Sequence, residues 1–448
     1  MSFAELWESL LPVGLDSTTG GYRRFSWTAA DDECRAWFRL AAAERGMRAA
    51  TDHNGNLWAW WDPPRVAGRV PGDAGGDPAA GGAPGSHPGH LPASGGAVGA
   101  GSHPGHLPAG AGAVVAGSHL DSVPDGGAFD GPLGVVSAFA AIELLREQGA
   151  VPGRPLGVAA FTEEEGSRFG VACLGSRLAV GAIDPGRARA LRDAAGVTLA
   201  EALTAAGHDP GRLGPDEELL SGIGAYVELH VEQGRGLAGL GAAVGLGAGI
   251  WPHGRWRLEF TGRADHAGTA RLAERHDPML PFAATVLAAR QAAEEHEALA
   301  TIGRVSAQPG AVNAVSAAVT AWLDVRGPDE AALQATVSEI LGGAEAAARE
   351  HQVTVVTGQE SATPEVEFDP GLRDRLAAAL ASRGISAPVI GTGAGHDAGV
   401  LAARLPTAML FVRNPSGVSH APAEYADEAD CLAGVEALAV VLRELACR

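Results

Sequence analysis

The 448-residue sequence contains no lysine, because all 33 of its cationic side chains are arginine. This absence excludes a Walker-type phosphate loop, a pyridoxal Schiff base and any other chemistry that needs a lysine amine. Aspartate and glutamate total 53, which gives a formal net charge of −20 at pH 7. Nucleic acids and anionic membranes are bound through a cationic face, so we expect neither as a partner. A small anionic substrate stays possible, since a few arginines can reverse the field inside one cleft.

Cysteines, aromatic residues and long apolar runs are also scarce. The four cysteines show no paired spacing, so neither a disulfide framework nor a thiolate metal site is indicated. No apolar run approaches membrane-spanning length, and the first residues lack a cationic segment followed by an apolar core. We therefore expect a soluble, cytoplasmic protein.

The length and the residue pattern predict two domains. Three segments, AVVAGSHLDS, PLGVAAFTEEEGSRFG and IGAYVELHVEQG, each read as an apolar strand that runs into a polar loop. With the helical patterns between them they predict an α/β fold, a mostly parallel sheet flanked by helices. From about residue 250, strands with one solvated face alternate with Ala-rich helices at 283–300 and 331–350. We expect a catalytic domain in two parts, 1–247 and 364–448, around an inserted smaller α+β domain of a sheet and two helices at 248–363.

Residues 64–112 form a low-complexity insertion rich in Gly, Pro, Ala and His. A repeat of period 16 runs through GSHPGHLPASGGAVGA (85–100) and GSHPGHLPAGAGAVVA (101–116) into GSHLDSVPDGGAFDG (117–131). One interpretation is an auxiliary metal-collecting tract built from His87, His90, His103 and His106. The other, which we favour, is a repeat expansion on a surface loop that has nothing to pack a core.

Metal-ligand residue types follow the predicted strands. His119 and Asp121 are two residues apart in an extended segment, so they point to the same side, and Asp121 is placed to accept the second N–H of a ligating His119. Asp130 lies among glycines in GGAFDGPLG, where its two oxygens could bridge two cations.

The triplet of residues 163–165 places three carboxylates at the end of an apolar strand, and a cation would relieve their mutual repulsion. One could ligate while its neighbour takes a proton from an attacking water. His230 in ELHVEQG and His420 in GVSHAPAEY complete a nitrogen and oxygen ligand set that suits zinc, manganese, cobalt or nickel. A lone buried histidine is usually a core residue and an acidic triplet is usually a solvated loop. Five such residues at strand ends of one domain instead favour a metal site.

The segments GSHLDSVPDGGAFDGPLGV, FTEEEGSRF, ELHVEQG, GRADHAGT and GVSHAPAEY, in this order, resemble the dinuclear-metal amidohydrolase and carboxypeptidase superfamily. More narrowly, they are similar to its N-carbamoyl-L-amino acid hydrolases, β-ureidopropionases and allantoate amidohydrolases. The resemblance covers nearly the whole chain outside 64–112. The resemblance implies that the inserted domain is a lid and dimerisation domain. It also points to the carbamoylase branch, because His230 stands where peptidase relatives carry an acidic ligand.

The resemblance also implies a role for each residue of the metal site. His119 and His230 would hold one divalent ion, Glu165 and His420 the other, and Asp130 would bridge them. Glu164 would be the general base and Asp121 the carboxylate behind the ligands. The implied reaction is hydrolysis of a ureido C–N bond, with loss of ammonia and carbon dioxide.

Residues of the inserted domain are implied to act on the substrate. His266 in ADHAGT would stabilise the oxyanion across the contact of a homodimer, although a surface histidine is the plainer interpretation. Arg326 offers a planar fork for a substrate carboxylate, and the alternative is a surface salt bridge with a neighbouring aspartate. The resemblance further assigns Gln233, Asn313 and the backbone of Gly395 to the same substrate.

Three questions stay open at this level. The run after His266 reads HAGTARLAERHDPM in place of the family's Thr-Thr-Pro-Met, and Arg271 and Arg275 in it are interpreted as surface residues. N-carbamoyl-L-amino acids and allantoate both carry a carboxylate beside a ureido group, so the residues serve either. A peptidase or N-acyl amino acid hydrolase with the same metals is the second hypothesis, and a non-catalytic metal-binding protein is a remote third.

Overall fold

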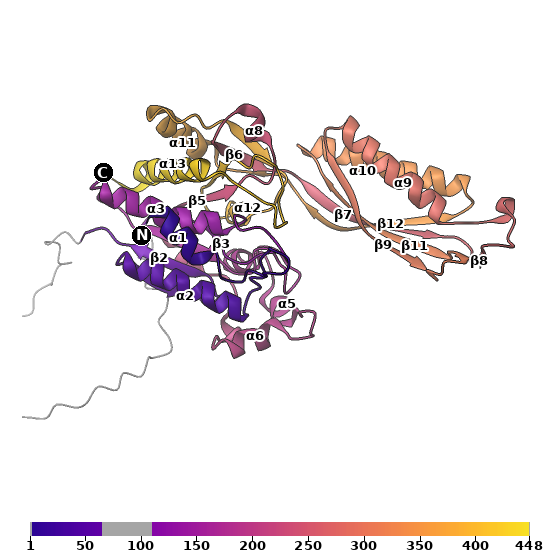
Figure 1. The fold of residues 1–448 in the computed structure, drawn as a ribbon, viewed down its shortest axis with the longest axis horizontal. Helices are drawn as coiled ribbons and strands as arrows, with labels where there is room; N and C mark the ends of the chain where they lie inside the picture. The colour runs from indigo at the N-terminus through magenta and orange to yellow at the C-terminus, as the bar shows by residue number, and fades with distance from the viewer. Residues whose placement is uncertain (1, 65–109, 448) are drawn as a thin grey trace, which may run out of the picture.

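A computed structural model describes residues 2–64 and 110–447. The histidines of the low-complexity insertion, His87, His90, His103 and His106, lie outside the described residues. Figure 1 shows a larger domain that contains both ends of the chain and a smaller domain joined to it by two neighbouring connections. Among the helices that are described, none combines the length and the apolar character that a bilayer crossing requires.

The larger domain is built on a nine-stranded sheet in the order β1-β2-β4-β3-β5-β15-β6-β13, with β14 also paired to β6. Its four central strands are parallel to one another, which confirms the predicted sheet: β4 (Leu156–Phe161), β3 (Ala113–His119), β5 (Ile223–Val231) and β15 (Thr407–Val412). The edges contain antiparallel pairs formed by β1 (Arg48–Thr51), β2 (Leu57–Trp61), β6 (Val244–Ile250) and β13 (Val366–Glu367), while β14 (Val389–Thr392) runs parallel to β6.

Helices cover both faces of this sheet, which is why every residue of β3, β4 and β15 is buried. One face packs on α1 (Phe3–Leu10), α2 (Ala29–Glu44), α3 (Pro132–Glu147), α11 (Pro370–Ser382) and α13 (Glu428–Ala446). The other packs on α7 (Glu217–Gly222), α8 (Gly236–Leu240) and α12 (Asp397–Leu401). A satellite core joins α4 (Leu174–Val180), α5 (Pro185–Ala190) and α6 (Leu199–Ala205), with the 3-10 turn η1 (Pro210–Arg212) after them.

The smaller domain is a four-stranded antiparallel sheet in the order β12-β7-β11-β9 with two long helices on one face (Figure 1). Its elements are β7 (His253–Thr261), α9 (Met279–Glu295), β9 (Leu299–Gln308), β11 (Ala318–Arg326), α10 (Glu330–Glu350) and β12 (Thr354–Thr363). Short segments complete it: β8 (Asp265–His266), η2 (Leu272–Glu274) and β10 (Ala314–Val315).

Alternate residues of β11 are buried, as expected of strands with one covered face. This confirms the predicted α+β domain of a sheet and two helices. The helix predicted at 283–300 was too long, because α9 ends at Glu295 and β9 begins at Leu299. Alanine-rich composition continues across that turn and conceals the change from helix to strand.

Candidate metal centre

The predicted ligands converge at the carboxyl edge of the parallel strands. His119 is the last residue of β3, His230 is the penultimate residue of β5, and Glu165 follows β4. Asp130 directly precedes Gly131, the N-cap residue of α3, and His420 follows β15. Because parallel strands end at one edge of their sheet, residues far apart in the chain meet there.

Two groups of potential ligand atoms form, and Asp130 belongs to both. His119, Asp130 and His230 make one group, and Asp130, Glu165 and His420 make the other, each with its ligand atoms within 4.8 Å of one another. Asp130 Oδ1 lies 3.1 Å from His230 Nε2, and Asp130 Oδ2 lies 3.3 Å from His420 Nε2. Each oxygen of one carboxylate therefore faces a different group, which is the arrangement of a bridging ligand.

The chemistry of these side chains fits a pair of cations. His230 Nε2 and Glu165 Oε1 are buried and have no hydrogen-bond partner within the described part of the chain. An unpaired buried polar atom costs free energy, and a bound cation would remove that cost for both. His230 Nδ1 is oriented by the Val231 carbonyl at 2.8 Å, which leaves Nε2 directed at the centre.

The protonation behaviour of the site points the same way. Burial, and then the charge of Asp130, raise the pKa of Glu165 to about 7. The hydrogen bond with Asp130 raises the pKa of His420 to about 9. Burial alone would raise the pKa of Asp130, but the adjacent imidazoles of His119, His230 and His420 hold it well below its ordinary value. Without cations these ligands stabilise one another by holding protons, which a metal ion would replace.

The acidic triplet is divided by its backbone. Glu163 has a positive φ of 55°, and its Oε1 accepts the backbone N–H groups of Arg168 and Phe169. Glu164 Oε2 lies 3.7 Å from His119 Nε2, so this carboxylate faces the first ligand group. Glu165 faces His420, with Oε2 at 3.6 Å from Nε2. Three adjacent carboxylates thus have three different surroundings.

Asp121 contacts both His119 and the acidic loop. Its backbone carbonyl, not its carboxylate, is hydrogen-bonded to His119 Nδ1 at 3.0 Å, while the nearest carboxylate oxygen is 3.6 Å from that nitrogen. The carboxylate instead accepts the backbone N–H groups of Glu164 and Glu165, each at 3.1 Å. Asp121 therefore orients the histidine through its main chain and the acidic loop through its side chain.

Two contributors were missed by sequence reasoning. Glu424 Oε2 accepts the backbone N–H groups of Phe129 and Asp130 at 3.1 and 3.0 Å. Its position four residues after His420, within GVSHAPAEY, was an available signal. Cys173 Sγ donates to Glu164 Oε1 at 3.2 Å, and nothing in the sequence around it indicated this contact.

A cavity of about 400 Å³ opens onto the metal centre and collects three of the predicted substrate residues. Gln233, Arg326 and Gly395 all line it. Gln233 Nε2 donates to Asp130 Oδ2 at 2.7 Å. Arg326 forms a salt bridge with Asp324 at 3.0 Å, which was the alternative interpretation of this residue. Arg326 also lines the cavity, so both interpretations hold.

Two predicted substrate residues lie elsewhere in the same chain. His266 is exposed in β8, and the Ala267 N–H donates to the carbonyl of Asn313 at 3.0 Å, so His266 and Asn313 are neighbours. Figure 1 shows β8 at the end of the smaller domain that is remote from the larger domain. Arg271 is exposed, as expected of a surface residue, whereas Arg275 is half-buried and donates to the backbone carbonyls of Ala267 and Ala270.

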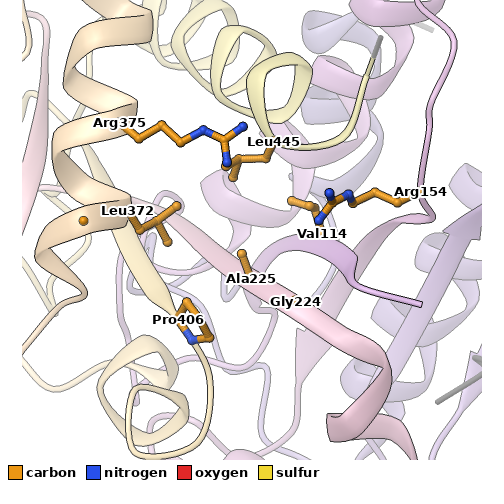
Figure 2. A pocket seen from close by; sticks show the side chains of 9 residues that line it. Val114, Arg154, Gly224, Ala225, Leu372, Arg375, Pro406 and Leu445 are labelled. Atoms are coloured by element: carbon orange, nitrogen blue, oxygen red, sulfur yellow. The ribbon is translucent and has the colours of Figure 1, made fainter. Parts of the chain in front are cut away.

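A second hollow, of about 280 Å³, lies near the opposite ends of the central strands. Figure 2 shows Arg154 and Arg375 in it, beside apolar side chains such as Leu372 and Leu445. Arg375 is engaged by Glu444 at 2.8 Å, and none of the lining residues is a histidine or a carboxylate. This hollow offers no hydrolytic chemistry.

Known proteins resemble the chain over most of its length. The model of Peptidase family M20/M25/M40 matches residues 115–444. An N-carbamoyl-L-amino acid amidohydrolase of Geobacillus stearothermophilus is 36% identical over 72% of this chain and 79% of that protein. An allantoate amidohydrolase of Escherichia coli is 32% identical over 72% of this chain and 78% of its own length. A crystal structure of a hydantoinase/carbamoylase family amidase from Burkholderia ambifaria superposes with a TM-score of 0.79 at 30% identity, covering 100% of this chain and 98% of that one.

The described fold, the ligand groups at the strand ends and these similarities agree with one another. The chain is a member of Peptidase family M20/M25/M40, and within it an amidohydrolase related to N-carbamoyl-L-amino acid and allantoate amidohydrolases.

Proposed function

We propose that the protein is a metal-dependent hydrolase that cleaves the ureido C–N bond of a small carboxylate substrate, an N-carbamoyl-L-amino acid or allantoate. The observation that carries the proposal is Asp130, whose two oxygens face two separate ligand groups beside the carboxylate of Glu164. Relatives named for both substrates support the reaction class.

The residues present would hold two divalent ions. His119 and His230 would bind one, Glu165 and His420 the other, with Asp130 shared between them. Zinc or manganese suits this nitrogen and oxygen donor set, and cobalt or nickel is also compatible with it. Two ions so placed would supply Lewis acidity, which lowers the pKa of water and stabilises negative charge on the carbonyl oxygen.

Glu164 would act as the general base and then as the general acid. Its Oε2 faces the ligand cluster, so it can take a proton from the attacking water and return it to the leaving nitrogen. Arg326 and Gln233, with the backbone of Gly395, would hold the substrate in the cavity they line. The carbamate released by C–N cleavage then takes up a proton and decomposes to carbon dioxide and ammonia.

The remote His266 and Asn313 are explained if the enzyme acts as a homodimer. Within one chain they lie at the far end of the smaller domain, so in this conformation they would reach a metal centre only on a partner subunit. His266 would there stabilise the developing oxyanion, and Asn313 would contact the substrate.

Subunit mixing tests this arrangement. A dimer of one His266→Ala chain and one Glu164→Gln chain contains one complete site if His266 acts in the partner. Refolding an equal mixture of the two inactive variants should then restore about one quarter of the wild-type activity, since about half of the dimers are mixed and each has one intact site of two. Activity that stays at the level of the separate variants would refute the exchange.

The reaction itself is tested by a substrate panel with zinc or manganese. The panel contains allantoate, N-carbamoyl-β-alanine, several N-carbamoyl-L-amino acids and the matching N-acetyl amino acids. Turnover of ureido compounds supports the proposal, whereas turnover of the N-acetyl series alone would favour the N-acyl hydrolase. Wild-type protein that binds metal and hydrolyses nothing in the panel would favour a metal-binding protein.

A further inference from the structure

A second chamber, separate from the hollow at Arg154 and Arg375, lies beside the metal centre and is not used by the proposed chemistry. Its volume is about 550 Å³, within the usual range for a small-molecule site. Gln233, Arg326, Ala394 and His420 line both this chamber and the 400 Å³ cavity, so the two adjoin. A substrate held by Arg326 and facing His420 therefore has space to extend into the second chamber.

The walls that distinguish this chamber are largely apolar. Trp251, Leu299 and Ile390 line it, and Leu299 is 56% exposed although it is a large apolar residue. Trp251 is seated against Gly391, where an added Cβ would lie 2.5 Å from the indole Nε1. Because Gly391 has no side chain, the indole ring of Trp251 can pack against its backbone. The ring therefore forms a fixed, flat wall of the chamber.

Few polar groups of the chamber are available to a ligand. The carboxylate of Glu232 already accepts the backbone N–H groups of Gly236 and Leu237. Arg235 is exposed, so its charge is screened by solvent. Arg326, at the boundary with the metal-site cavity, donates to the Asp324 carboxylate and the Gly393 carbonyl, and its other N–H groups are the cationic donors placed for a carboxylate.

We propose that this chamber binds the substrate's side chain, and that the substrate is an N-carbamoyl amino acid with a large apolar side chain, such as N-carbamoyl-L-phenylalanine. The inference rests on the proposed function, because it takes the ureido group to lie at the metal centre and the carboxylate at Arg326. Allantoate carries a second ureido group where an amino acid carries its side chain. Burying that group against Trp251 and aliphatic side chains leaves its N–H groups and carbonyl without partners, which is unfavourable.

The test compares kcat/KM for N-carbamoyl-L-phenylalanine, N-carbamoylglycine, N-carbamoyl-L-glutamate and allantoate. Transfer of a phenyl side chain into the chamber should favour the phenylalanine compound over the glycine compound by roughly 10- to 100-fold. Glutamate or allantoate as the best substrate, or equal values for phenylalanine and glycine, would overturn the assignment.

Two neighbouring residues of β14 provide a matched pair of variants. Ile390 lines the chamber, whereas Val389 precedes it on the strand and is 50% exposed on the other side. Ile390→Ala should lower kcat/KM for the phenylalanine compound by roughly 3- to 10-fold and leave the glycine compound unchanged. Val389→Ala should change neither value. A loss of the same size on both substrates in Ile390→Ala would instead indicate a general structural effect and refute the side-chain contact.

Failure of the proposed reaction is distinguishable from failure of this inference. If the protein hydrolyses only N-acetyl amino acids, the ureido assignment is wrong. The same comparison is then made between N-acetyl-L-phenylalanine and N-acetylglycine, where a preference for phenylalanine that Ile390→Ala reduces still supports the chamber. Absence of that preference in the series that is turned over refutes it.

Discussion

Gly131→Ala should displace the proposed metal ligand His119 without altering any ligand residue. Gly131 has a φ of 84°, and a Cβ at this position would lie 2.4 Å from Cε1 and 2.5 Å from both ring nitrogens of His119. Non-bonded carbons settle at about 3.5–4.0 Å, so the imidazole would have to move by about 1 Å. Metal-ligand distances tolerate a change of only about 0.2 Å. His119 is buried, so its ring has no free space into which it can rotate.

The matched control is Gly149→Ala, near the other end of the same helix. Gly149 has a φ of 68°, and an added Cβ there meets nothing within 4 Å. Both variants carry the backbone cost of an L-residue at positive φ, roughly 1–2 kcal/mol, partly offset by a stiffer unfolded chain. Only Gly131→Ala adds the collision, so we expect a total destabilisation of about 2–4 kcal/mol against about 1 kcal/mol for the control.

Metal analysis and urea unfolding with and without EDTA measure both effects. Gly131→Ala should bind one of the two proposed ions at least about 10-fold more weakly, since even changes to residues that only contact the ligands have effects of this size. Gly149→Ala should bind both as the wild type does. Wild-type metal affinity in Gly131→Ala would refute the placement of His119 in the ligand set.

Three further predictions concern the acidic loop. Glu164→Gln should retain both ions by metal analysis and lose roughly 100- to 10,000-fold in kcat, whereas loss of metal would make Glu164 a ligand. Cys173→Ala should lower kcat about 5-fold by removing the S–H donor to Glu164, and Cys173→Ser should restore it. Cys173→Gly should also remove the backbone strain of the left-handed φ of 54°, so this variant should be more stable than Cys173→Ala. A more stable protein that keeps the lower kcat would show that Cys173 acts by positioning Glu164 and not by packing. In metal-free protein, burial and the charge of Asp130 raise the pKa of Glu165 from 4.5 to about 7. The stability that the protonated Glu165 contributes to the folded state is therefore fully present below about pH 4.5 and is lost as pH rises through 7. Glu165 should therefore lower urea stability by up to about 3 kcal/mol between about pH 5 and pH 8, and Glu163 and Glu424, whose pKa burial also raises to about 7, should lower it further. A rise in stability over that window would contradict the assignment.

Local sequence patterns were sufficient for the elements that carry the site. The continuous apolar runs that end in His119 and before Glu163 predicted buried parallel strands with polar loops at their ends, and β3 and β4 are such strands. The change to alternating apolar and polar residues after residue 250 predicted the second sheet, to which β7 and β11 belong. These patterns are readable because the alternation of side chains along a strand is a property of one chain segment.

Contacts between loops were decided only by the tertiary structure. The sheet order β4-β3-β5-β15 brings together ends separated by up to about three hundred residues, and no local period encodes that order. It determines that the oxygens of Asp130 divide between two ligand groups and that Glu424 holds the backbone at Asp130. It also places the carboxylate of Asp121 on the acidic loop and not on His119, because the extended i, i+2 relation sets a side but not a partner.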